Sequence, residues 1–159
     1  MKLTKRPLLI WVEGADLTGK STLIKELNKK TDYKHTVIDR GPISTAAYAL
    51  KNKRKVNILD YLNTLAFASR SIDNMLIIHC IAPTETILDR LSCMCGTDDY
   101  QATNTEELEK EINEDKSTFD RLVKMLEPLI PVVTVESTVP TSTMVEDVIG
   151  FIHSLDEEN

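Results

Sequence analysis

The eight residues from Gly14 to Ser21 read GADLTGKS and fit the pattern GxxxxGK followed by Ser or Thr at every specified position. An unbroken apolar run, 8–12, comes before them, and a segment with leucine and isoleucine at helical spacing, 20–30, follows. Such a loop wraps its backbone N–H groups around phosphate oxygens, and Gly14 and Gly19 allow conformations that a Cβ would obstruct. The segment therefore predicts a phosphate-binding loop between a buried strand and a helix.

The alternative is a turn that only joins a strand to a helix. Such a turn explains Gly14 or Gly19 singly, but not a lysine and a serine in the first helical turn, where a bare lysine opposes the helix dipole. In a phosphate loop, Lys20 is placed to neutralise the β- and γ-phosphates of ATP, and Ser21 to ligate Mg²⁺. We therefore expect ATP and Mg²⁺ as cofactors. The predicted nucleotide-binding residues are Gly14, Ala15, Asp16, Leu17, Thr18, Gly19, Lys20, Ser21 and Thr22.

Strand-like apolar runs alternate with segments of helical periodicity along the 159 residues. The predicted strands are 8–12, 35–39, 75–81 and 132–135. The predicted helices are 20–30, one that begins near Ser44, 58–70, 84–91, 104–126 and 143–155. Strands joined by crossovers of this length form a parallel sheet covered on both faces. The pattern predicts one α/β domain, 1–159, with the P-loop NTPase fold: a small parallel sheet of about four strands with helices on both faces.

Two predicted helices begin with a capping box, in which a polar residue caps the first turn and a glutamate follows three residues later. Asn104 with Glu107 marks the start of the long helix, and Thr143 with Glu146 marks the start of the last one. The residues 156–159 then predict a solvated tail. The side of the long helix expected to face the core carries Ile112, Phe119, Leu122 and Leu126.

Composition argues against several classes of protein. The net charge of -6 disfavours broad electrostatic binding to nucleic acid, and the basic run 51–55 is interpreted as a solvated loop, with phosphate binding as the alternative. The apolar run 8–12 is too short for a signal peptide or a membrane span, so we expect no membrane association. Cys80, Cys93 and Cys95 have neither disulfide-framework nor zinc-site spacing, and they suit the reducing cytoplasm.

A carboxylate and a guanidinium follow the second predicted strand. Asp39 ends the apolar run and Arg40 comes next, before the turn at Gly41. The carboxyl ends of parallel strands form the edge where open α/β sheets bind ligands. We therefore expect Asp39 to hold a metal-bound water or accept a proton, and Arg40 to bind phosphate oxygens. A surface ion pair at a strand end is the alternative.

At these residues the chain resembles the thymidylate kinase and deoxynucleoside kinase group of P-loop kinases. Residues 13–22 are similar to the group's EGxDxxGKST start, and residues 39–48 to its DRxxxSxxAY segment. The strand, proline and helix at 78–91 are a weaker match to the approach to the group's mobile lid. The short chain is similar to compact relatives of thymidylate kinase that viruses encode, and we expect a compact, phage-type member of this group.

The resemblance implies a set of roles. Asp16 would lie beside the acceptor and the metal, and Asp39 would be the second acidic group, so Lys20, Asp39, Arg40 and Asp16 are the expected catalytic residues. Arg40, Ser44, Tyr48 and Arg90 would contact the substrate or form the base of the lid, which would be the loop 93–103. Ser21 and Asp39 would hold Mg²⁺, and the segment 136–140 would lie near adenine. Tyr48, Tyr61 and Phe67 are interpreted as packing residues, with base stacking as the alternative.

The chain departs from this group at two places. The linker 31–34 takes the place of a longer acceptor-binding segment that carries a base-stacking aromatic residue. Leu17 in the loop, and the residues 93–95 before Gly96, stand where the group has a catalytic arginine. The transition-state charge would then be met by Lys20, Arg40, Arg90 or Arg70.

These observations lead to one expected function and two alternatives. We expect an ATP- and Mg²⁺-dependent nucleotide kinase that phosphorylates a deoxynucleoside monophosphate such as dTMP or a related pyrimidine nucleotide. One alternative is a kinase acting on a hydroxyl of a nucleoside or of a modified base in DNA, whose backbone would rest on the run 51–55. The other is a nucleotide-binding module without turnover. A homodimer through the helix 58–70 is an open alternative to burying that helix in the core.

Overall fold

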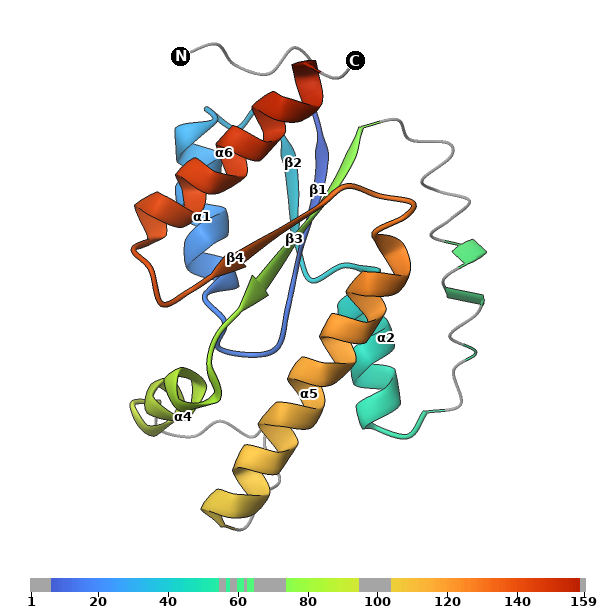
Figure 1. Ribbon diagram of the computed structural model, residues 1–159, viewed down its shortest axis with the longest axis vertical. Helices are drawn as coiled ribbons and strands as arrows, with labels where there is room; N and C mark the ends of the chain where they lie inside the picture. Colours follow the sequence, from blue (N-terminus) through green and yellow to red (C-terminus); the bar gives the residue numbers. More distant parts are fainter. Residues whose placement is uncertain are drawn as a thin grey trace.

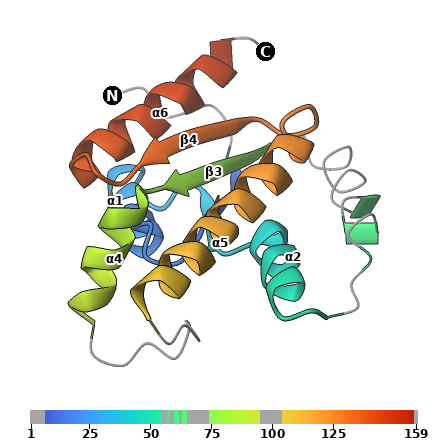
Figure 2. The same ribbon diagram turned by 60° about the horizontal axis from the view of Figure 1, so that its bottom comes forward.

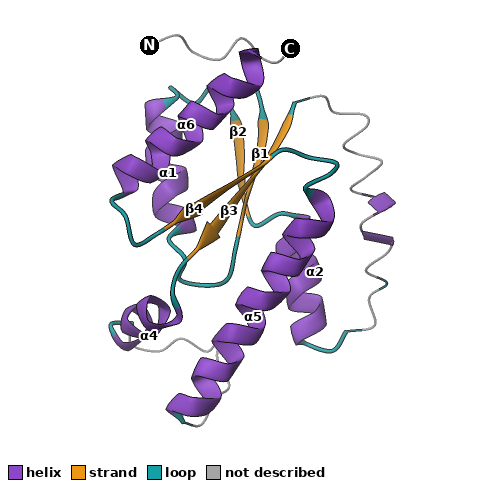
Figure 3. Ribbon diagram, in the orientation of Figure 1, coloured by secondary structure: helices purple, strands orange, loops and turns teal. Residues whose placement is uncertain are grey.

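The computed structural model describes residues 7–54, 57, 60–61, 63–64, 74–94 and 104–157. The described strands are β1 (Leu9–Glu13), β2 (Thr36–Asp39), β3 (Met75–Ile81) and β4 (Val132–Glu136). The described helices are α1 (Lys20–Lys30), α2 (Pro42–Lys51), α4 (Thr84–Ser92), α5 (Thr105–Leu126) and α6 (Thr141–Glu157). The described part of the chain is thus an alternation of strands and helices, as the sequence predicts (Figure 3).

The strands form one parallel sheet in the order β2-β1-β3-β4. β1 lies in the middle and pairs with both β2 and β3, which brings Val12 of β1 level with Asp39 of β2. Helices α1 and α6 cover one face, and α2 and α5 cover the other (Figure 1). Turning the molecule shows β3 and β4 side by side between α6 and α5 (Figure 2). The predicted fold class, a four-stranded parallel sheet with helices on both faces, is therefore confirmed.

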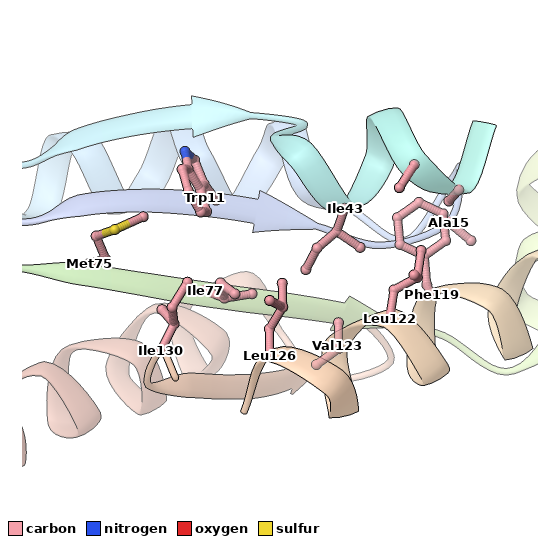
Figure 4. Close-up of a cluster of buried hydrophobic side chains, with 12 residues drawn as sticks. Trp11, Ala15, Ile43, Met75, Ile77, Phe119, Leu122, Val123, Leu126 and Ile130 are labelled. Carbon is pink, nitrogen blue, oxygen red and sulfur yellow. The ribbon is translucent and has the colours of Figure 1, made fainter. Parts of the chain in front are cut away.

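Each face of the sheet has its own apolar core. Alternate residues of β1 point to opposite faces, so Trp11 packs under α2 and α5, whereas Ile10 and Val12 pack under α1 and α6. The first of these clusters joins strand residues to Ile43 of α2 and to the inner side of α5 (Figure 4). Because both faces are covered, the strands need apolar residues at consecutive positions, which explains the unbroken apolar runs. The inward-facing residues predicted for α5 are all buried: Ile112, Phe119, Leu122 and Leu126.

Helix boundaries confirm one predicted cap and correct another. The side chain of Asn104 accepts a hydrogen bond of 2.9 Å from the backbone N–H of Glu107, as expected of an N-cap. The predicted cap at Thr143 is wrong, because the backbone N–H groups of Thr143 and Met144 already donate to the carbonyl of Pro140. The last helix therefore begins at Thr141, two residues earlier than predicted.

The end of the last helix and the start of α2 also differ from the prediction. α6 continues to Glu157, two residues beyond the predicted end at Leu155, because half-buried Leu155 still packs on the core. Within the predicted solvated tail, Glu157 is exposed although it is helical, and residues 158–159 lie outside the described residues. α2 begins at Pro42, whose fixed φ suits the first turn of a helix, and not near Ser44. Most of the predicted helix 58–70 lies outside the described residues. Within the described part of the chain, no helix has the length and apolar character needed to cross a bilayer.

Candidate functional site

The loop that the sequence predicts to bind phosphate, called the phosphate loop below, joins β1 to α1 at the carboxyl edge of the sheet. Its backbone has positive φ at Gly14 (+143°), Leu17 (+61°) and Gly19 (+82°). A Cβ on Gly14 would lie 2.2 Å from the carbonyl oxygen of Cys80, so only glycine fits there. Gly19 is the N-cap of α1, and no side chain caps this helix. The first-turn amides are therefore left for a ligand, in a geometry suited to an anion.

The side chain of Lys20 folds back into the phosphate loop. Its Nζ donates to the carbonyl oxygens of Gly14, at 2.9 Å, and Ala15, at 2.6 Å, and the side chain is buried. Burial lowers the pKa of Lys20 below its ordinary value, although nearby Asp16 opposes this shift. An ammonium held with so little solvent is a strong partner for a phosphate, because the local dielectric is low.

Ser21 and Asp39 form an oxygen pair at the start of α1. The pairing of β1 with β2 puts Asp39 at this edge, and the Ser21 hydroxyl donates to its Oδ2 at 3.3 Å. Both side chains are exposed and line the same cavity. Hydroxyl and carboxylate oxygens are the hard ligands that Mg²⁺ prefers, and its remaining ligands are usually water and phosphate oxygens. These two residues therefore fit the magnesium site that the sequence predicts.

Arg40, Asp16 and Tyr48 meet on the other side of the loop. Arg40 has a φ of +61°, which turns its side chain back so that Nη2 donates to Oδ1 of Asp16. Its guanidinium also lies 5.2 Å from the centre of the Tyr48 ring. The Tyr48 hydroxyl is buried near Asp16 but makes no hydrogen bond of normal geometry to a described residue. Burial, reinforced by Asp16, raises the pKa of Tyr48 above its ordinary value, so the hydroxyl keeps its proton.

Glu13 supports the candidate site from within the fold, a role that the sequence reasoning did not assign to it. Its carboxylate is fully buried and accepts hydrogen bonds from the backbone N–H groups of Gly41 (2.9 Å), Ile43 (3.1 Å) and Ser44 (3.0 Å). The Ser44 hydroxyl donates to it as well. Burial raises the pKa of Glu13, and the four hydrogen bonds oppose this shift. The carboxylate thereby fixes the start of α2, and with it the turn that carries Arg40.

Ser44 and Tyr48, two residues predicted to contact the substrate, lie away from the cavity beside the phosphate loop. The side chain of Ser44 is buried, and its hydroxyl is taken up by Glu13. Tyr48 packs edge-on against Phe119, with ring centres 6.3 Å apart, in agreement with the packing interpretation of this aromatic residue. Neither Ser44 nor Tyr48 is among the residues that line the cavity beside the loop. A role of either residue in binding substrate stays a prediction.

A cavity of about 740 Å³ joins most of these groups, a size typical of small-ligand sites. Cys93 and Met94 border it, whereas the rest of the predicted lid, 95–103, and Arg70 lie outside the described residues. Of the predicted site residues, Gly14, Ala15, Thr18, Ser44 and Tyr48 do not line the cavity; Ala15 and Thr18 are buried in the loop itself. The predicted residues that line it are Asp16, Leu17, Gly19, Lys20, Ser21, Thr22, Asp39, Arg40 and Arg90.

Arg90 of α4 closes one side of the cavity. Its guanidinium donates to the Leu17 carbonyl at 2.6 Å and to the hydroxyl and carbonyl of Ser137, each at 2.8 Å. Ser137 follows β4 and lies within the segment 136–140 that the resemblance places near adenine. The sequence did not single out this serine, because a lone serine after a strand is a common loop residue.

The basic run and the cysteines have structural surroundings of their own. Lys51 is the last residue of α2, and its Nζ lies 2.9 Å from a carboxylate oxygen of Glu111 and 2.8 Å from one of Asp115. The interpretation of the run as a solvated loop is therefore wrong for Lys51. Cys80 is buried behind the phosphate loop, and burial raises the pKa of its thiol to about 12. This thiol therefore stays protonated at neutral pH.

Comparison with known proteins gives structural matches only. No protein-family model matches the chain, and no curated protein sequence matches it. The structure is similar to YorR from Bacillus subtilis in complex with phosphorylated GDP, with a TM-score of 0.72 and 16% identity over 95% of this chain and 98% of YorR. It is also similar to deoxyadenosine kinase from M. mycoides with bound dCTP, with a TM-score of 0.61 and 15% identity over 92% of this chain and 100% of that one.

The same M. mycoides enzyme with its products dCMP and dCDP matches with a TM-score of 0.59 and 16% identity over 92% of this chain and 100% of that one. Identities this low establish the fold and leave the activity open. The parallel sheet, the phosphate loop and these likenesses agree: the chain has the α/β P-loop fold found in deoxynucleoside and nucleotide kinases.

Proposed function

We propose that the chain is an ATP- and Mg²⁺-dependent kinase that transfers the γ-phosphoryl group to a deoxynucleoside monophosphate, such as dTMP or a related pyrimidine nucleotide. One observation carries the proposal: Ser21 and Asp39 form an exposed oxygen pair beside Lys20, at the uncapped start of α1. A strand-to-helix turn without a ligand has no use for this combination of a hydroxyl, a carboxylate and an ammonium.

On the side of the phosphoryl donor, ATP, different residues bind the phosphates and the metal. The loop amides and Lys20 bind the phosphates of ATP, and Ser21 and Asp39 hold Mg²⁺. When bound, Mg²⁺ neutralises charge that develops on the phosphate oxygens. Arg90 and Ser137 border the same cavity near Gly19, which supports the proposal that the adenine lies along the segment 136–140.

On the acceptor side, Asp16 and Arg40 are the candidate groups. Arg40 offers a planar guanidinium to a phosphate of the acceptor, and it reaches the cavity while paired with Asp16. Asp16 is buried, and its Oδ1 accepts a hydrogen bond from Nη2 of Arg40. The Asp16 side chain thereby orients the guanidinium, and Asp16 is the candidate to accept a proton from an attacking hydroxyl.

The second candidate is a kinase for a nucleoside hydroxyl, and the Arg40–Asp16 pair favours it. Because Asp16 already neutralises Arg40, the acceptor side has less free positive charge for a phosphate. The fold is also that of a deoxyadenosine kinase. DNA as the carrier of the hydroxyl gains less support, because Lys51 of the basic run is paired with Glu111 and Asp115.

The test is an assay of ADP release with Mg²⁺ and ATP, run across deoxynucleoside monophosphates, deoxynucleosides and oligonucleotides with and without modified bases. The proposal predicts acceptor-dependent ADP release that is highest with a pyrimidine monophosphate. Release only with nucleosides or only with modified DNA would select the second candidate. Tight ATP binding without ADP release for any acceptor would leave a nucleotide-binding module as the function.

A further inference from the structure

Arg90 connects three segments that are far apart in the sequence. It belongs to α4, donates to the Leu17 carbonyl of the phosphate loop, and makes two hydrogen bonds with Ser137 after β4. Figure 2 shows α4 following the end of β3 and lying beside α5. The side chain is half-buried, and its three hydrogen bonds are all directed at the protein.

The Leu17 carbonyl is a sensitive point of the loop. Leu17 has a φ of +61° and Gly19 one of +82°, and such left-handed residues make the N–H groups of a loop converge on an anion. A carbonyl oxygen that turned into this cradle would repel a phosphate. The bond to Arg90 keeps the Leu17 oxygen against the guanidinium, where it cannot turn toward the phosphates.

Two further contacts hold the same part of the loop. The Leu17 side chain packs on the small cluster of Ala82, Ile87 and Ile112, which comes from the end of β3, α4 and α5. On the other side, a Cβ on Gly19 would lie 3.2 Å from the Cβ of Ser137, so the two backbones approach closely. Leucine at position 17 therefore anchors the loop to α4 and α5, and Arg90 completes the anchor through the backbone.

We propose that Arg90 is a positioning residue that holds the phosphate loop in its binding shape through Leu17 and Ser137, and that it does not act on the transferring phosphoryl group. The inference rests on the proposed function, because it assumes that the loop binds the phosphates of a nucleotide. A positioning role affects ATP and ADP alike, since the loop holds the phosphates that both share. Turnover at saturating nucleotide should change little.

The experiment measures ADP affinity with a fluorescent ADP analogue, and then kcat and the KM for ATP, in Arg90→Gln, Arg90→Lys, Ser137→Ala and the Arg90→Gln/Ser137→Ala double variant. Loss of charge-assisted hydrogen bonds should weaken ADP binding by about 10- to 100-fold in Arg90→Gln. Ser137→Ala should weaken it less, and the double variant should add little, because the two residues share bonds. Arg90→Lys should recover only part of the affinity, since a lysine cannot bridge both partners.

The matched control is Arg121→Gln, an exposed arginine on α5 away from this cavity, which should leave ADP affinity unchanged. A fall in kcat with unchanged ADP affinity in Arg90→Gln, together with a silent Ser137→Ala, would overturn the proposal and assign Arg90 to the transferring group. If a thermal unfolding test shows that Arg90→Gln does not fold, ADP affinity and kcat are compared in Arg90→Lys and Ser137→Ala instead. Absence of ADP binding by the unaltered chain would instead refute the proposed function.

Discussion

Single side chains at the loop set the expected chemistry, and Lys20 is the first of them. Removing it in Lys20→Ala strips a buried charge from a preorganised phosphate site, so turnover should fall by at least about 100-fold. The matched control is Lys25→Ala, which changes an exposed lysine on the same helix. The measurement is the rate of ADP release at saturating ATP. A near-normal rate for Lys20→Ala would contradict the role given to the loop.

The second prediction concerns Asp39 and separates phosphoryl transfer from ATP binding. Asp39→Asn keeps the size of the side chain but removes the negative charge beside Ser21, so it should slow phosphoryl transfer more than it weakens ATP binding. The measurements are kcat, ATP affinity and the Mg²⁺ concentration needed for half-maximal activity. A variant that loses only ATP binding would show that Asp39 does no more than hold the metal, and would contradict a role in the transfer step.

Residue identity alone did not reveal Glu13 or Ser137. Glu13 reads as the polar end of an apolar run, and its hydrogen-bond partners lie 28 to 31 residues further along the chain. The available signal was the glutamate itself, because a buried carboxylate must find several donors. Sequence reasoning could have asked where those donors were, but it could not have named them.

Among the secondary-structure elements, α2 depends on β1 for the placement of its first turn. Glu13→Ala leaves three backbone N–H groups and the Ser44 hydroxyl without their partner, so the free energy of unfolding should fall by about 3 kcal/mol or more. Glu13→Gln should lose less, because an amide keeps one acceptor oxygen. Urea unfolding measures both, with the exposed Glu146→Ala as the control. If Glu13→Ala lowers the free energy of unfolding no more than Glu146→Ala does, Glu13 does not hold the first turn of α2.

Element boundaries show the same division between local and distant causes. The Asn104 cap was predictable because donor and acceptor are three residues apart. The start of α6 was not, because Thr143 and Glu146 form a plausible capping box while Pro140 begins the helix earlier. A local motif competes with a neighbouring helix start, and packing of the helix on the sheet decides which one is used.

For the molecule as a whole, two buried histidines make stability depend on pH. Burial lowers the pKa of His35 and of His79 below the ordinary value of 6.5, although Asp120 opposes the shift at His79. The Nδ1 atom of His35 accepts a 3.1 Å hydrogen bond from the N–H of Leu8, which protonation of that nitrogen would remove. Below about pH 6.5 the unfolded chain therefore binds more protons than the folded one, and the free energy of unfolding should fall as the pH falls.

The measurement is urea unfolding between pH 5 and pH 8, for the unaltered chain and for His35→Asn. Asparagine can offer an oxygen to the N–H of Leu8 but does not titrate. The free energy of unfolding of His35→Asn should therefore fall less steeply below about pH 6.5 than that of the unaltered chain. Equal slopes in the two proteins would remove His35 as a source of the effect.

The phosphate loop, the four strands and the cap at Asn104 were all predictable from the order of amino acids, because each depends on residues a few positions apart. The contacts that assemble the site were not. Ser21 meets Asp39 across 18 residues, and Arg90 meets Leu17 across 73 and Ser137 across 47. An amino acid's type limits what it can bind, but the strand order and the packing of the helices decide which partner comes within hydrogen-bonding distance.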